Sequence, residues 1–447
     1  MQTKVPAEDS QARNLTPQPA VELARHILDL VFAGVEAPLI ALQDGTVLHR
    51  ASDSIDAMVE LKHAGGLRLL LGGASDLSAG EAAMRGDIKV KGDIERAFAA
   101  MDAVAATRTP KDWLKIASLA AGLPHAPSGA PPSVRRPAKL RGRVHSLERD
   151  RAAIAYHYDV SNDFYALWLD SNMVYSCAYF KDTSDTIDEA QLQKCDLICR
   201  KLRLKRGERL LDIGCGWGGL VRFACREYGV EALGVTLSQR QADYAQTRIK
   251  DEGLHGRCQV KLLDYRELGT HGRFDKIASV GMVEHVGDAM LPLYFQAAFQ
   301  ALAPGGLFLN HGIISQRGRP QGRPAPASRF LPHRSRFTES YVFPDGEMPE
   351  LARMCEAAAQ AGFEVRDVEN LREHYTLTLR CWRRRLEEHE REARSIVGDG
   401  TFNVWRFWLA GSAHNFAIGS LGVVQMVLAK DLPGAGTTLL RREELYR

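Results

Sequence analysis

The sequence predicts an α/β fold in which a parallel sheet binds its ligand at the carboxyl ends of the strands. The first observation is the apolar run 210–213, which breaks into a glycine-rich turn at 214–218 and is followed by a helical pattern. The second is that strand-like and helix-like segments alternate after this turn, which is typical of right-handed βαβ units. The expected strands are 231–236, 258–263 and 274–280, with helices from Ser238 and near 289–302.

The glycine-rich turn can form a cradle for a nucleotide-type ligand. Gly214, Gly216 and Gly218 let the backbone turn sharply and let a ligand approach where a Cβ would collide. The N–H groups at the start of the following helix favour negative charge. The same spacing also fits a tight strand-to-helix turn that binds nothing. Asp264, just beyond the third strand, is placed to hydrogen-bond an adenine amino group, although a solvated loop aspartate fits its position equally well.

Composition limits the class of protein. The chain has 447 residues, 45% of them hydrophobic and 25% charged, which fits two or three globular domains. The polar N-terminus has no apolar signal region, and no run approaches the length of a membrane span, so we expect a soluble, cytoplasmic protein. The eight cysteines include no Cys-x-x-Cys, which favours reduced thiols over disulfides or a zinc site. A net charge of +3 argues against a nucleic-acid partner.

Five segments stand in the order seen in cyclopropane-fatty-acyl-phospholipid synthases and the related mycolic acid cyclopropane synthases. They are Tyr-His-Tyr-Asp-x-x-Asn-x-Phe-Tyr at 156–165, Tyr-Ser-Cys-Ala-Tyr-Phe at 175–180, Leu-Leu-Asp-Ile-Gly-Cys-Gly-Trp-Gly at 210–218, Gly-Val-Thr-Leu-Ser at 234–238 and Ser-Val-Gly-Met-Val-Glu-His-Val-Gly at 279–287. The third of these resembles motif I of class I S-adenosylmethionine (SAM) methyltransferases. The likeness runs from about residue 150 to the C-terminus.

The resemblance implies a class I SAM-dependent methyltransferase: a Rossmann-like, seven-stranded, mostly parallel sheet with a smaller N-terminal α+β domain. We therefore expect a disordered N-terminus at 1–19, the small domain at 20–120, a Pro-rich and then basic linker at 121–150, and the methyltransferase domain at 151–447. The small domain should contain a helix at 21–34, a hairpin at 39–48 and a helix at 93–101. The sheet should be completed by a strand at 307–310, the segment 362–371 and a strand at 422–430, with long helices at 376–397 and 401–416.

The resemblance also implies a reaction. Family members transfer the SAM methyl group to a cis double bond of an acyl chain in a membrane phospholipid, and a bound bicarbonate then removes a proton to close a cyclopropane ring. An alternative is a relative that stops after methylation and leaves a methyl-branched or methylene product. A third hypothesis is a lipid-binding or regulatory protein that keeps the fold. The intact set Cys177, Glu284, His311 and Tyr375 argues against the third.

Motif matching places the bicarbonate site on Cys177, Glu284, His311, Ile313 and Tyr375. Glu284 and His311 each follow a predicted strand, which should put both at the sheet edge where SAM lies. Three of these residues also have an ordinary structural explanation. Cys177 can be a small core residue, Glu284 can cap the next helix, and His311 can be a histidine whose hydrogen bonds serve the fold alone. The sequence carries Ser412 where many family members have a cysteine near the C-terminal helix, so a covalent cysteine mechanism at that position is excluded.

The SAM site implied by the resemblance is formed by the glycine turn, the 175–176 segment and the ends of the second and third strands. Together with Asp264, its residues are Tyr175, Ser176, Gly214, Gly216, Gly218, Thr236, Leu237, Ser238, Gln241, Tyr265 and Arg266. One departure from general methyltransferases is that no acidic residue ends the second strand to bind the ribose hydroxyls.

Two basic segments are candidates for contact with a membrane surface. Residues 134–151 contain seven Lys or Arg and two acids, and 316–337 contain six arginines, four prolines and no acids. Each is either a solvated basic segment or a surface for anionic headgroups, at about 1 kcal/mol per charge. We expect a cytoplasmic enzyme that is peripherally associated with the membrane and acts on phospholipids with unsaturated acyl chains. The chain length, double-bond position, headgroup and oligomeric state, a homodimer included, are left open.

Overall fold

The computed structural model describes residues 18–52, 55–71, 76–125, 135–158, 160–316, 335–431 and 441–446. The chain divides into two compact units, residues Met1–Pro131 and Pro132–Arg447. Residues 1–17 of the predicted disordered N-terminus and 317–334 of the arginine-rich segment lie outside the described residues.

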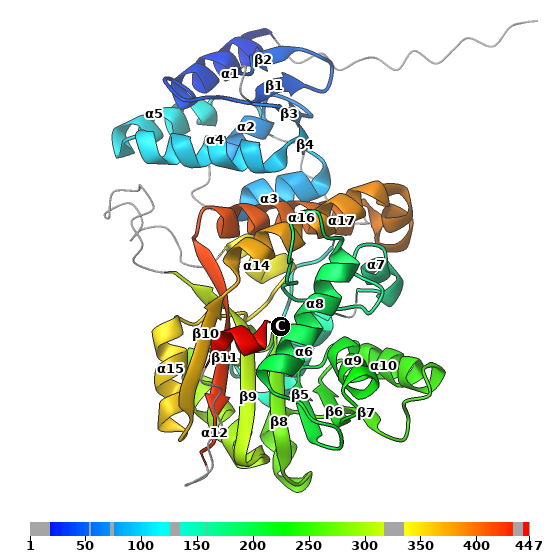
Figure 1. The fold of residues 1–447 in the computed structure, drawn as a ribbon. Helices are drawn as coiled ribbons and strands as arrows, with labels where there is room; N and C mark the ends of the chain where they lie inside the picture. The colour runs from blue at the N-terminus through cyan, green and yellow to red at the C-terminus, as the bar shows by residue number, and fades with distance from the viewer. Residues whose placement is uncertain are drawn as a thin grey trace, which may run out of the picture. The chain divides into compact units, whose positions relative to one another are not determined.

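The first unit is an α+β structure (Figure 1). Its strands are β1 (Leu39–Leu42), β2 (Val47–His49), β3 (Ala57–Leu61) and β4 (Ile88–Gly92), and its helices are α1 (Gln18–Val31), α2 (Gly66–Leu71), α3 (Asp76–Arg85), α4 (Ile94–Thr107) and α5 (Pro110–Ala121). The sheet order is β2-β1-β3-β4. The predicted hairpin is confirmed, because β1 and β2 pair antiparallel around Asp44-Gly45. Strands β3 and β4 were not among the expected elements, although Ile88 and Val90 of β4 alternate with lysines in the pattern of a half-buried strand.

Two helices of this unit illustrate how the sequence sets their limits. Helix α1 buries a stripe of apolar residues, Val21, Ala24, Ile27, Leu28 and Val31, as its spacing predicts. It ends at Val31, earlier than expected. Helix α4 begins after Asp93, whose side chain accepts hydrogen bonds from the N–H groups of Glu95 and Arg96.

The second unit is built on a seven-stranded sheet (Figure 1). Its strands are β5 (Arg209–Ile213), β6 (Glu231–Thr236), β7 (Cys258–Leu262), β8 (Phe274–Val280), β9 (Leu302–Ser315), β10 (Glu364–Asn370) and β11 (Leu421–Ala429). The order is β10-β11-β9-β8-β5-β6-β7. Strands β7, β6, β5, β8 and β9 are parallel, and β11 runs antiparallel to both β9 and β10. The predicted mostly parallel, seven-stranded sheet is confirmed.

Helices cover both faces of this sheet. One face packs against α8 (Ile187–Lys201), α9 (Gly219–Glu227) and α10 (Gln239–Asp251), and the other against α12 (Leu291–Ala301) and α15 (Leu351–Gln360). Successive residues of a strand point to opposite faces, so Leu210 joins the first core and Leu211 the second. Because both faces are covered, the strands read as continuous apolar runs.

Residues 155–158 and 162–165 of the aromatic segment lie in helices, although the sequence pattern there shows no clean helical period. The segment spans the end of α6 (Leu147–Tyr158) and α7 (Asn162–Ala166). Phe164 and Tyr165 are fully buried. The Nδ1 atom of His157 lies 2.6 Å from the carbonyl oxygen of Val342, so a distant segment of the chain fixes α6.

The remaining elements complete the second unit. They are η1 (Tyr265–Thr270), α11 (Val283–Val286), η2 (Asp288–Met290), α14 (Arg336–Tyr341), α16 (Arg372–Glu388), α17 (Glu390–Ala417) and η3 (Arg442–Leu445). Gly398 interrupts α17 with non-helical angles, φ 75° and ψ 165°. None of the helices within the described ranges is both long and apolar enough to cross a bilayer.

Candidate active site

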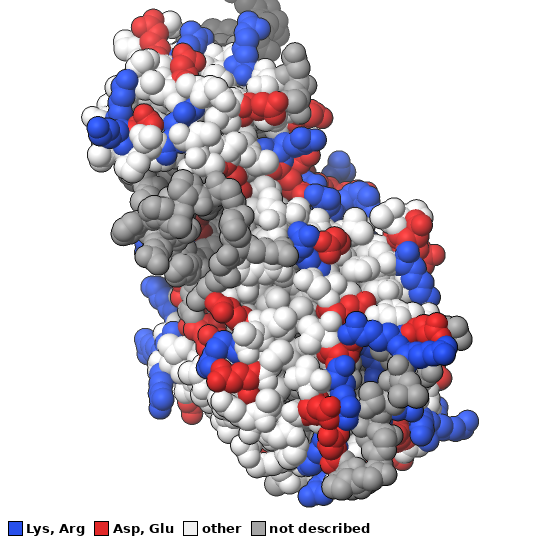
Figure 2. All heavy atoms as spheres, turned by 60° about the vertical axis from the view of Figure 1, so that its left-hand side comes forward, with Lys and Arg blue, Asp and Glu red and all other residues white. Residues whose placement is uncertain are grey.

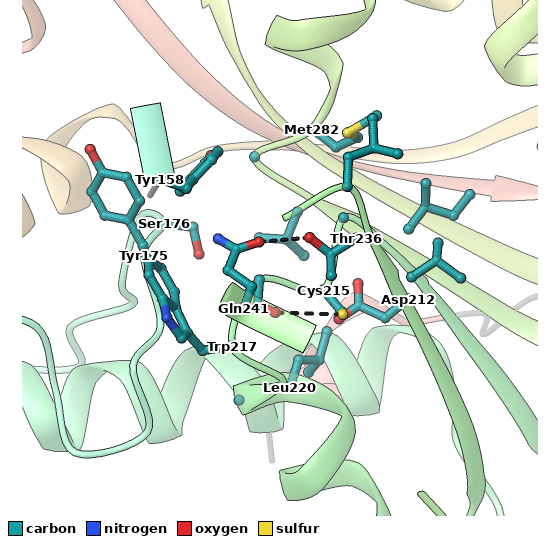
Figure 3. A pocket seen from close by; sticks show the side chains of 18 of the residues that line it. Tyr158, Tyr175, Ser176, Asp212, Cys215, Trp217, Leu220, Thr236, Gln241 and Met282 are labelled. Carbon is teal, nitrogen blue, oxygen red and sulfur yellow. Dashed lines mark hydrogen bonds between the residues drawn. The ribbon is translucent and has the colours of Figure 1, made fainter. Parts of the chain in front are cut away.

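A cleft that is partly open to solvent lies at the carboxyl ends of β5, β6 and β8. Its walls come from the glycine turn after β5, the segment 173–176, the start of α10 and the residues that follow β7 and β8. Figure 3 shows side chains from these segments around one space. This is the edge of a parallel sheet at which ligands bind in doubly wound folds.

The glycine turn forms the floor of the cleft. Gly214 and Gly216 line it, with φ of 80° and 54°, a backbone conformation that favours glycine. A Cβ added to Gly216 would meet no atom within 4 Å, so a side chain there would extend into open space. Gly218 does not line the cleft. A Cβ on Gly218 would lie 3.0 Å from the Cβ of Ala245, so this glycine allows α9 and α10 to pack closely.

The end of β6 supplies a second wall. Thr236, Leu237 and Gln241 line the cleft, and the Thr236 hydroxyl donates to Gln241 Oε1 at 2.7 Å. This bond fixes the carboxamide, whose nitrogen points into the cleft in Figure 3. Ser238 is buried and does not line the cleft. It is the N-cap of α10, and its hydroxyl accepts from the N–H of Gln241.

The segment after β7 supplies a third wall. Asp264 and Tyr265 line the cleft, and Asp264 is only 1% exposed. Arg266 lies behind them. Its guanidinium donates to both oxygens of Asp264, at 2.6 and 2.8 Å, and to Asp150 at 2.9 Å. Arg266 thus orients Asp264 and ties it to the beginning of α6.

Tyr175 and Ser176 form the wall opposite β6, and α8 holds them in place. Lys194 donates from Nζ to Ser176 Oγ at 2.8 Å, and Gln191 donates to the carbonyl oxygen of Ser176 at 2.9 Å. The Tyr175 ring packs against Trp382, with ring centroids 5.2 Å apart. Burial raises the pKa of Tyr175 well above its usual value, so its hydroxyl stays protonated.

The five residues matched to the bicarbonate site come from four segments beside this cleft. Cys177 follows Ser176, Glu284 lies in α11, His311 and Ile313 lie in β9, and Tyr375 lies in α16. The expectation that His311 follows a strand was wrong. Strand β9 extends to Ser315, because it pairs with β11 along that length, so His311 and Ile313 lie inside the sheet.

Hydrogen bonds fix the members of this group in place. Glu284 Oε1 accepts from the backbone N–H of Ile313 at 2.6 Å, and His311 Nδ1 lies 3.2 Å from Gln425 Nε2 of β11. Cys177 Sγ lies 3.7 Å from the carbonyl oxygen of Leu371. Burial is the main cause of the raised pKa of Tyr375, and electrostatic interactions with Cys177 and Glu284 add to it, so the three side chains lie within electrostatic range of one another.

Burial controls the charge of this group. It raises the pKa of Glu284 to about 7 and lowers the pKa of His311 well below its usual value. His311 is therefore a neutral imidazole. Glu284 Oε2 and His311 Nε2 are both buried, and neither has a hydrogen-bond partner among the described residues. Two unpartnered polar atoms on buried side chains indicate a place for a small polar ligand.

Several residues of the cleft were not singled out from the sequence: Tyr158, Lys194, Asp212, Trp217, Met282 and His285. Tyr158 and His285 hydrogen-bond to each other at 3.2 Å, and burial lowers the pKa of His285 to about 4. Asp212 carried a signal that could have identified it, because it is the one charged residue in the apolar run that enters the glycine turn. Burial raises its pKa to about 7.

Known proteins resemble this chain in sequence and in fold. A model of the mycolic acid cyclopropane synthetase family matches residues 145–426. A probable fatty acid methyltransferase of Pseudomonas putida is 47% identical over 314 residues, which cover 68% of this chain and 76% of that protein.

Two solved structures are similar to part of this chain. The cyclopropane synthase MmaA2 from Mycobacterium tuberculosis has a TM-score of 0.59 and 35% identity, covering 63% of this chain and 98% of that one. The mycolic acid cyclopropane synthase CmaA1, complexed with S-adenosylhomocysteine and CTAB, has a TM-score of 0.57 and 33% identity, covering 62% of this chain and 97% of that one.

Proposed function

Because the chain belongs to the mycolic acid cyclopropane synthetase family of SAM-dependent methyltransferases that act on lipids, we propose that it is a cyclopropane-fatty-acyl-phospholipid synthase. The proposed reaction transfers the methyl group of SAM to a cis double bond of a phospholipid acyl chain, and bound bicarbonate then removes a proton to close the ring. The observation that carries the proposal is the buried pair of unpartnered atoms, Glu284 Oε2 and His311 Nε2, beside the cofactor cleft.

The cleft fits SAM, which supplies an electrophilic methyl group when it is bound. The open space at Gly216 can hold a ligand, which a larger side chain at this position would displace. Asp212 lines the same cleft, and its Oδ1 has no hydrogen-bond partner in the described structure. We propose that Thr236, Leu237 and Gln241 hold the ribose, and that Asp264 and Tyr265 hold the adenine. In this proposal Gly218, Ser238 and Arg266 act indirectly, because they fix the residues that line the cleft.

The polar group beside the cleft fits bicarbonate, which supplies a base when it is bound. Gln425 donating to His311 Nδ1 leaves the imidazole proton on Nε2, where it can donate to an anion oxygen. Glu284 Oε2 can accept from the hydroxyl of that anion, since Oε1 is already held by Ile313. Cys177 and Tyr375 stay protonated, because burial raises both pKa values, and each offers a further donor.

Aromatic side chains can stabilise the carbocation that forms on the acyl chain. Tyr158, Tyr175 and Trp217 line the cleft, and Trp168 and Trp405 are fully buried nearby. The faces of aromatic rings carry negative potential, which attracts a cation and excludes water. An alkene is a weak nucleophile, so close positioning against the methyl group must supply much of the rate enhancement.

An exposed basic segment supports the proposal that the enzyme meets its phospholipid at a membrane surface. Arg136, Lys139, Arg141 and Arg143 are exposed and form no ion pair with described residues, and the adjacent Val144 is 48% exposed. Elsewhere the charges are mixed: Figure 2 shows basic and acidic side chains interspersed on the face that it draws. A local basic segment is suited to anionic headgroups.

A second product has one specific observation in its favour. The relative from Pseudomonas putida is named as a probable fatty acid methyltransferase, a name that does not require ring closure. If the carbocation lost its proton from another carbon, or from the methyl group after a hydride shift, the product would be a methyl-branched alkene or a chain with a methylene group. The two products separate cleanly by proton NMR, because cyclopropane protons resonate apart from methyl and vinyl protons.

The test is to express the chain in cells that lack cyclopropane lipids and to analyse the phospholipids by mass spectrometry and proton NMR. We expect acyl chains that gain one methylene unit and show cyclopropane protons. The same mass gain with a methylene or methyl-branch signal would support the second product, and no change in any lipid would contradict both.

A further inference from the structure

Lys194 is a buried lysine that the proposed chemistry does not use. It lies in α8, is 1% exposed and lines the cofactor cleft. Its Nζ donates to Ser176 Oγ at 2.8 Å, and no carboxylate oxygen of the described residues lies within 4.0 Å of it. Asp170 and Asp212 interact with this ammonium only from a longer distance. A buried ammonium without a close ion pair is unfavourable, so its presence favours the binding of an anion there.

The cleft also contains a carboxylate that Lys194 does not neutralise. Asp212 lines the same space, and its Oδ1 is buried without a hydrogen-bond partner in the described structure. The ammonium of Lys194 acts on Asp212 from a distance, because it opposes the rise in pKa that burial imposes on that carboxyl. One cation and one anion thus border the cleft without pairing, an arrangement that matches a zwitterionic ligand.

Helix α8 fixes the position of Lys194. Gln191 lies almost one turn earlier on the same helix, and it donates to the carbonyl oxygens of Val174 and Ser176 at 3.2 and 2.9 Å. Because the two side chains are three residues apart, they lie on one face of the helix. Lys194 therefore lines the cleft from a fixed position on α8, and its hydrogen-bond partner Ser176, labelled in Figure 3, lines the cleft beside it.

We propose that Lys194, with the hydroxyl of Ser176, binds the α-carboxylate of the amino-acid moiety of SAM, while Asp212 faces the α-ammonium of the same moiety. The role is one of positioning, because a fixed carboxylate holds the sulfonium methyl at one place in the cleft. The inference rests on SAM as the methyl donor and is independent of which lipid product forms.

The test compares two ligands that differ in a single group. SAM and decarboxylated SAM share the adenosine, the sulfonium and the terminal amine, and only SAM carries the carboxylate. Isothermal titration calorimetry of the wild-type protein should show SAM binding roughly 10- to 100-fold more tightly, the usual effect of a charge-assisted hydrogen bond. Lys194→Met should remove most of this preference by weakening SAM, with little change for decarboxylated SAM.

Gln191→Met is the matched control, since it removes a buried polar side chain from the same face of α8 but no charge. It should weaken both ligands by similar factors and keep the preference. Thermal denaturation checks that each variant is folded, and Lys194→Gln replaces Lys194→Met if the latter is not. Equal loss for both ligands in the Lys194 variant, or no loss for either, would overturn the inference. Failure of the wild type to bind either ligand would instead count against the cofactor assignment.

Discussion

Glu284 and Ile313 are joined by a hydrogen bond of 2.6 Å from the backbone N–H of Ile313 to Oε1 of Glu284. This bond attaches the short helix after β8 to strand β9, and it gives the two carboxylate oxygens different roles. Oε1 is held by the sheet, whereas Oε2 is buried without a partner among the described residues and can receive a ligand.

Replacing Glu284 with glutamine should separate catalysis from cofactor binding. Glu284→Gln keeps the shape and the hydrogen bond from Ile313 but removes the negative charge. We expect turnover to fall on the order of 100-fold or more, because one preorganised electrostatic partner is lost. SAM affinity should change little, since Glu284 does not line the cleft.

Bicarbonate provides the second readout of this variant. Adding bicarbonate to carbonate-depleted wild-type enzyme should restore activity, and Glu284→Gln should respond weakly. Glu356→Gln, the same substitution on the exposed surface of α15, serves as the control and should behave as the wild type. A wild-type enzyme that is indifferent to carbonate depletion would contradict the assignment of the base.

The pKa of Glu284 predicts how stability depends on pH. Burial raises this pKa from 4.5 to about 7, so in that interval the folded state holds a proton that the unfolded state releases. The free energy of unfolding should therefore fall as pH rises through the interval, by on the order of 3 kcal/mol for this group alone. Urea denaturation at pH 5 and pH 8 should show a smaller fall for Glu284→Gln than for the wild type. Burial also raises the pKa of Asp212, so this residue lowers the free energy of unfolding over the same pH interval in both proteins. The difference between the two falls therefore reports the contribution of Glu284. An equal fall in the free energy of unfolding for both proteins would contradict a raised pKa of Glu284.

Replacing Gly216 with valine should block the cofactor. The new side chain would extend into the cleft, and we expect no measurable binding of SAM by calorimetry. The positive φ of 54° also strains a β-branched residue, so a control must share that strain. Gly253→Val is suitable, because Gly253 has φ of 68°, has no atom near its Cβ position and lies exposed after α10. Retained SAM affinity in Gly216→Val would show that the cofactor lies elsewhere.

The exposed basic segment should determine membrane binding. Changing Arg136, Lys139, Arg141 and Arg143 to glutamine should reduce sedimentation with anionic vesicles, since each charge contributes about 1 kcal/mol near the surface. Wild-type binding should weaken with salt, because exposed charges are screened within about 10 Å at 0.1 M. The control removes the same charge from another exposed region, at Arg240, Lys250, Arg257 and Lys261. Equal losses in both variants would indicate a general effect of net charge rather than this segment.

The sequence predicted the sheet well because its strands carry their own signal. Continuous apolar runs mark β5, β6 and β8, since both faces of the sheet are covered. The sequence signals were weaker where tertiary contacts determine the secondary structure. The aromatic residues at the end of α6 are helical because distant partners such as Val342 hold them, and β9 extends past residue 310 because β11 pairs with it.

The candidate site was predicted in part, for a related reason. Motifs identified residues whose position along the chain is distinctive, such as Gly216 and Glu284. They did not identify Lys194, which sits in an amphipathic helix where a lysine is ordinarily solvated. Only the packing of α8 against the 174–176 segment buries its ammonium and turns it toward the cleft.

The place of β11 in the sheet has a consequence for how the enzyme is made. It is the last of the seven strands along the chain, yet it lies between β9 and β10 and carries Gln425, which orients His311. On the ribosome, β9 and β10 therefore emerge with unpaired edges, and they stay open to misplaced pairing until the chain beyond residue 429 is released. The nascent chain can form its glycine turn early, but the polar residues around His311 reach their final arrangement only after β11 has emerged.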